Sequence, residues 1–102
     1  MEPLKFRIVP EAVLDVDEVV AYYETQRVGL GKAFDDEVTR TILRICNLPT
    51  TGSYITADTR ICRTHRFPYG IVYQRQSAEI VVLAVHHLSR DPAGWTGRLQ
   101  GE

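Results

Sequence analysis

Residues 59–98 read TRICRTHRFPYGIVYQRQSAEIVVLAVHHLSRDPAGWTGR and contain three runs typical of β-strands. Residues 60–66 alternate polar and apolar side chains, as a half-buried strand does, and residues 69–75 are rich in β-branched and aromatic side chains. Residues 80–85 are apolar on both faces, which predicts a central strand covered on both sides. Because residues 76–78 supply only a short turn, we expect the last two runs to pair as a hairpin.

The first half of the chain carries one more strand-like run and two helical patterns. Alternation over residues 4–9 predicts a first strand, and Pro10 suits the first turn of a helix that should end near Gln26–Val28. A second helix is expected from Leu30 to Asn47, followed by a loop over residues 50–58. The apolar stripes predicted to face the core are Val13, Val16, Val20 and Tyr23 in the first helix and Leu30, Phe34, Val38, Ile42 and Ile45 in the second.

The order of these elements predicts the fold class. A strand, two helices and three strands form segregated runs, which favour an α+β domain: a mostly antiparallel four-stranded sheet with an N-terminal helical hairpin on one face. The length of 102 residues fits a single domain over residues 1–102. No apolar run approaches the roughly 18 residues of a membrane span, and the N-terminus has no apolar signal core, so we expect a cytoplasmic protein.

The net charge of −1 conceals a difference between the two halves. Residues 1–58 carry six basic and ten acidic side chains, whereas residues 59–102 carry six basic and three acidic ones. Nearly all the positive charge is arginine, which favours bidentate recognition of carboxylates or phosphates. A protein that binds ribosomal RNA is expected to be more basic overall.

The two cysteines do not predict a metal site or a disulfide. Cys46 and Cys62 have no CxxC spacing, so we expect two buried free thiols. The sequence also has no phosphate-binding glycine loop and no metal-ligand spacing. We therefore expect no cofactor and no metal.

An ordered set of residues in the second half of the chain matches a known family pattern. The set is Arg60, then Phe67-Pro68-Tyr69, Ile71-Val72-Tyr73 and Leu83-Ala84-Val85, then His87, Arg90, Asp91-Pro92 and Trp95. In these residues the chain resembles the RelE/ParE superfamily of small bacterial toxins, and more closely its ParE-like, plasmid-stabilisation branch. The resemblance covers most of the chain and implies the same α+β fold.

The resemblance implies a function. A ParE-like protein is the toxin of a type II toxin–antitoxin system, which inhibits growth by binding DNA gyrase without turnover of its own. A ParD-like antitoxin would neutralise it in a hetero-oligomer, through a disordered segment that folds on binding. Two alternatives remain: a ribosome-dependent mRNA endoribonuclease of the RelE type, and a non-toxic remnant that only binds its antitoxin.

The resemblance and the charge pattern together indicate a set of target-binding residues. The arginines of residues 60–66 are expected either to be solvated or to pair with the acidic helices, or, for Arg60 as the resemblance implies, to face a groove and receive an anionic group. The two neighbouring histidines, 86 and 87, should point to opposite faces of the sheet. Trp95 is expected either to fold back as a lid, which we favour, or to be an exposed anchor. The full predicted set is Arg60, Arg63, Arg66, His87, Arg90 and Trp95.

A catalytic role would need a different use of the same residues. In a ribonuclease His87 would act as the base, with Arg60 and Arg90 stabilising phosphate charge. No tyrosine follows Tyr73 and the middle strand has no lysine, which disfavours this alternative within the superfamily. For the antitoxin, we expect docking on the acidic helical hairpin at the apolar residues outside the packing stripes, namely Leu14, Tyr22 and Leu43.

Overall fold

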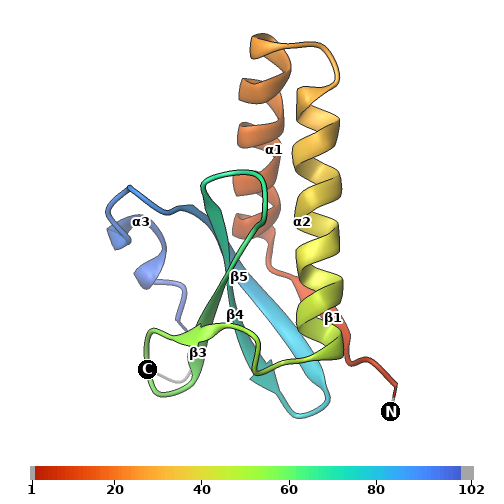
Figure 1. The fold of residues 1–102 in the computed structure, drawn as a ribbon. Coiled ribbons are helices and arrows are strands. Elements are labelled where there is room, and N and C mark those ends of the chain that lie inside the picture. The colour runs from red at the N-terminus through yellow and green to blue at the C-terminus, as the bar shows by residue number, and fades with distance from the viewer. Residues whose placement is uncertain (1, 100–102) are drawn as a thin grey trace.

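A helical hairpin packed against a sheet forms the body of the protein in the computed structural model, which describes residues 2–99 (Figure 1). In chain order the elements are β1 (Lys5–Ile8), α1 (Pro10–Gln26), α2 (Leu30–Asn47), β2 (Ser53–Tyr54), β3 (Thr59–Arg63), β4 (Tyr69–Gln76), β5 (Glu79–His87) and α3 (Ala93–Thr96). The predicted α+β class, with the hairpin on one face of the sheet, is confirmed. None of the helices in the described part of the chain is long and apolar enough to cross a membrane.

The sheet has one strand more than the sequence predicts. Its order is β1-β5-β4-β3-β2, with β1 parallel to β5 and every other pair antiparallel. The additional strand is β2, in which Ser53 pairs with Ile61 and Tyr54 with Arg60. Two residues are too few to show a period of two, so the sequence predicts only a loop there.

The turn between the helices is built from two glycines and a glutamate. Gly29 adopts a positive φ of 88°, a conformation that side chains other than hydrogen disfavour. The backbone N–H groups of Gly29 and Gly31 both donate to the carboxylate of Glu24 in α1. A Cβ at Gly31 would lie 2.6 Å from the carbonyl oxygen of Val20, so only glycine lets the two helices approach this closely.

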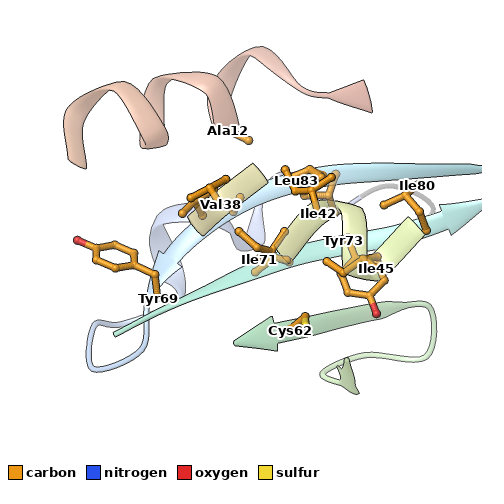
Figure 2. Close-up of a cluster of buried hydrophobic side chains, with 14 of the residues drawn as sticks. Ala12, Val38, Ile42, Ile45, Cys62, Tyr69, Ile71, Tyr73, Ile80 and Leu83 are labelled. Carbon is orange, nitrogen blue, oxygen red and sulfur yellow. The ribbon is translucent and has the colours of Figure 1, made fainter. Parts of the chain in front are cut away.

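The core lies between the hairpin and the sheet, as Figure 2 shows. The stripe predicted for α2 is confirmed, and Cys46 and Cys62 are buried free thiols as expected. The stripe predicted for α1 is wrong at Val13, which is exposed, because Ala12 occupies the fully buried position of that turn. The main side chains of this core are Ala12, Phe34, Val38, Ile42, Ile45, Tyr69, Ile71, Tyr73, Ile80 and Leu83.

The outer edge of β5 is closed by side chains where β1 ends. β1 stops at Ile8, opposite Val82, while β5 continues to His87. Beyond that point the carboxylate of Asp15 accepts the backbone N–H of Val85 at 3.0 Å. The guanidinium of Arg98 donates to the carbonyl of Leu83 at 3.1 Å and to Asp15 at 2.8 Å. These bonds also hold the C-terminal segment against α1.

Candidate functional site

Arg60 lines a cavity of about 300 Å³ at the end of the sheet nearest β2. It shares the helix side of β3 with Cys62, whose sulfur accepts a hydrogen bond from Arg44 of α2. The Arg60 guanidinium donates to the carbonyls of Gly52, at 2.6 Å, and Thr50, at 3.3 Å. It also stacks on Tyr54, with 3.7 Å from its central carbon to the ring centroid. Arg60 therefore lines a cavity, where two carbonyls and the Tyr54 ring hold its guanidinium; that it receives an anionic group stays a prediction.

Arg75 is a second cation in the same cavity, and the sequence analysis did not single it out. It lies on β4 two residues beyond Tyr73, which pairs with Arg60. Its Nε donates to the carbonyl of Ser77 at 3.3 Å. The missing signal was the cross-strand register, because Arg60 and Arg75 are fifteen positions apart and become diagonal neighbours only once the pairing of β3 with β4 is known. We call this site the Arg60 cavity.

Arg63 and Arg66 do not line the Arg60 cavity. By strand alternation Arg63 points away from the side that carries Arg60, and it lines a separate pocket with Arg44 and His65. Arg66 is exposed in the turn after β3, with its guanidinium 5.2 Å from the ring of Phe67. The predicted arginines therefore surround β3 instead of forming one continuous face.

His87 and Arg90 lie together at the other end of the sheet, in a cleft of about 370 Å³ that we call the His87 cleft. The His87 ring packs edge-on against Tyr69, at 5.0 Å between centroids, and its Nδ1 bonds to Ser89. Burial raises the pKa of the Tyr69 hydroxyl, with a smaller effect of Tyr23 in the same direction. The Tyr69 hydroxyl therefore stays protonated at neutral pH and can donate a hydrogen bond.

The two histidines point to opposite faces of the sheet, as predicted. His87 faces the helices through Tyr69, whereas His86 packs against Trp95 on the side that α3 covers (Figure 1). Trp95 is only 8 % exposed, so of the two alternatives the folded-back lid is the one found. Burial lowers the pKa of His86, which favours its neutral form.

Arg60 and His87 do not converge on one site. Arg60 pairs with Tyr73, and His87 pairs with Tyr69 four residues earlier on β4. At about 3.3 Å per residue, roughly 13 Å of strand separates them. The predicted set thus divides between the two ends of the sheet. Tyr69, placed beside His87 by the fold, is a hydroxyl that the sequence analysis did not assign to this cleft.

The three residues predicted for antitoxin docking are exposed on the helical hairpin. Leu14 and Tyr22 are 61 % and 58 % exposed, and Leu43 is 48 % exposed. An apolar groove of about 200 Å³ lies nearby between β1 and the two helices, lined in part by Phe6 and Val13. Val13 was not assigned to this surface because its helical spacing predicted a core-facing position.

The part of the chain that the structure describes offers no group of three or more histidine, cysteine, aspartate or glutamate side chains that could hold a metal ion. The described residues form arginine-lined cavities, and apolar side chains are exposed on the helical hairpin.

Comparisons with known proteins agree with this fold. The family model described as "ParE toxin of type II toxin-antitoxin system, parDE" matches residues 6–92. A solved structure described as a chromosomal ParDE toxin–antitoxin system from P. aeruginosa has a similar fold, with a TM-score of 0.73 and 14 % sequence identity, covering 84 % of this chain and 97 % of that one. No functionally curated protein matches the sequence.

The fold and the comparisons place the protein in the class of small toxins from type II toxin–antitoxin systems. The chain belongs to the ParE toxin family, because the family model matches most of its length.

Proposed function

We propose that this ParE-family toxin acts in the cytoplasm by binding DNA gyrase, and that a cognate ParD-like antitoxin neutralises it. Family membership supports this proposal. The observation that supports binding is the separation of Arg60 from His87 and Arg90, because the catalytic arrangement considered from the sequence would place all three around one scissile bond. Binding by the target-facing residues Arg60, Arg63, Arg66 and Arg90 requires no such convergence.

A supercoiling assay tests the gyrase proposal. Purified protein should inhibit ATP-dependent supercoiling of relaxed plasmid by gyrase, and the Arg60→Gln variant should inhibit it at least tenfold less strongly. Arg7→Gln is the matched control, because Arg7 is an exposed arginine whose partner is Glu79 at the opposite edge of the sheet. Supercoiling that continues unchanged at a large excess of wild-type protein would refute gyrase as the target.

The hairpin surface is proposed as the antitoxin-binding site. Leu14, Tyr22 and Leu43 expose apolar area that a folding antitoxin segment could cover. Co-purification with the product of the adjacent small reading frame should fail for a Leu14→Glu, Tyr22→Ser double variant. The matched control is Val28→Ser, which changes an apolar residue exposed in the turn between the helices. Equal recovery of antitoxin with both variants would place the interface elsewhere.

A ribonuclease is the second candidate function, and one observation favours it. The fold brings Tyr69, His87 and Arg90 together in the His87 cleft, which supplies the tyrosine that the C-terminal sequence lacks. Induction of His87→Ala separates the two functions: retained growth inhibition excludes His87 as a catalytic base, whereas loss of inhibition together with loss of mRNA cleavage in translating cells supports it. If wild-type induction has no effect on growth, the protein is a remnant that only binds its antitoxin.

A further inference from the structure

The Arg60 cavity is lined by two arginines that form no ion pair with any described residue. The ion pairs found among described residues use Arg7, Lys32, Arg40 and Arg98, and neither Arg60 nor Arg75 takes part in one. Both guanidinium groups line the same space of about 300 Å³. Two like charges facing one cavity repel each other, so an anion placed between them would be favoured.

The Arg60 guanidinium is already held in a fixed orientation. One nitrogen, Nη1, makes both hydrogen bonds to the carbonyls of Thr50 and Gly52, and the plane of the group stacks on Tyr54. No described residue accepts a hydrogen bond from its Nη2 or Nε. A carboxylate can take two parallel bonds from one edge of a guanidinium, and a fixed guanidinium loses little entropy in making them.

The charges around the cavity favour a single negative charge over several. Asp58 also lines the space, where its Oδ1 accepts hydrogen bonds from the hydroxyls of Thr56 and Thr59. Two arginines and one aspartate leave a balance of about one positive charge, which matches one carboxylate. The net charge of −1 for the whole chain disfavours a nucleic-acid backbone, whose binding depends on many basic contacts.

We propose that the Arg60 cavity is a receptor for one acidic side chain, glutamate or aspartate, presented by a protein partner. The carboxylate lies between Arg60 and Arg75, and the methylene groups next to it pack on Pro49. This inference rests on the proposed function insofar as the toxin acts through protein partners. It adds the chemical group that the partner must supply at this position.

The test is an NMR titration of the full chain with small probes. N-acetyl-glutamate N-methylamide should produce saturable shifts at the Arg60 side-chain Nε–H and at the amides of Gly52 and Tyr54. The neutral isostere N-acetyl-glutamine N-methylamide should bind at least tenfold more weakly, a difference of about 1.4 kcal/mol. Equal responses to both compounds, no saturable response, or preferential binding of inorganic phosphate at matched ionic strength would each overturn the proposal.

Variants show whether the two arginines are responsible. Arg60→Gln and Arg75→Gln should each weaken binding of the glutamate probe at least tenfold, whereas Arg7→Gln, which changes an exposed arginine at the opposite edge of the sheet, should leave it unchanged. Arg75→Gln provides an independent readout if Arg60→Gln perturbs the fold. The NMR titration and the supercoiling assay can fail independently. If the protein inhibits gyrase but does not bind the carboxylate probe, only this inference is overturned. If it binds the carboxylate probe but does not inhibit gyrase, only the choice of gyrase as the target is overturned.

Discussion

Arg98 and Arg60 use the same side chain in two different ways at two regions of the molecule. Arg98 bonds to both oxygens of Asp15 and to the carbonyl of Leu83, and it closes the free edge of β5. Arg60 bonds only to carbonyls of the loop after α2 and lines an open cavity. The difference suggests a criterion: an arginine paired with a carboxylate of its own chain supports the fold, and one held by carbonyls alone is available to a partner.

The largest effect is expected at the paired arginine. Asp15→Ala removes the partner of Arg98 and leaves the amide of Val85 without its acceptor, so the free energy of unfolding should fall by about 3 kcal/mol. Urea denaturation followed by circular dichroism measures this change. A decrease in the free energy of unfolding of less than about 1 kcal/mol would show that the Asp15–Arg98 pair stabilises the fold no more than an exposed ion pair does.

Glu37 is a buried carboxylate with two partners, and it extends the comparison to an acidic side chain. Glu37→Gln should lower the free energy of unfolding by about 2 kcal/mol at neutral pH. Its carboxylate accepts the amide of His65 at 2.6 Å and pairs with Arg40 at 3.0 Å. Burial alone would raise its pKa, but the His65 amide and Arg40 outweigh burial and hold the pKa below the ordinary 4.5.

This shift predicts a pH dependence with a definite sign. Because the pKa is lower in the folded state, the stability contributed by the Glu37 carboxylate is complete above the unfolded pKa of about 4.5 and is lost as the pH falls through the folded value. The stability difference between wild type and Glu37→Gln should therefore shrink below about pH 4.5. A difference that stays constant from pH 7 to pH 3 would contradict the assignment.

Arg60→Gln should separate function from stability. The free energy of unfolding should fall by about 1 kcal/mol, because the variant loses the charged hydrogen bond to the Gly52 carbonyl. Inhibition of the target should fall at least tenfold. Thermal denaturation and the supercoiling assay on the same preparation provide both values. If Arg60→Gln proves as destabilising as Asp15→Ala, the criterion drawn from the two arginines is wrong.

The smallest effect is expected at an exposed ion pair. Arg7 and Glu79 pair at 3.1 Å across β1 and β5, with both side chains substantially exposed. Arg7→Gln should change the free energy of unfolding by less than about 0.5 kcal/mol, and this small change should disappear in high salt. A larger decrease in the free energy of unfolding, measured by urea denaturation, would mean that pairing an arginine with a carboxylate stabilises this fold even at the surface.

The elements that sequence analysis predicted most closely are those with long, regular patterns. Helix α2 spans Leu30–Asn47 as predicted, and the three C-terminal strands lie where the strand-like runs indicated, with shifts of at most three residues at their ends. The pattern was wrong at Val13, because the orientation of a helix depends on what it packs against. It also missed β2, which exists only because β3 offers it backbone partners.

Local patterns in this sequence determined its two long helices, four of its strands, their order and the position of most core residues, because periodicity follows from the geometry of each element alone. Only the tertiary structure decided which charged residues become neighbours. Strand register placed Arg75 beside Arg60 and Tyr69 beside His87, and it kept Arg60 and His87 apart. The physical reason is that such contacts depend on the pairing of segments distant in sequence, which no local period records.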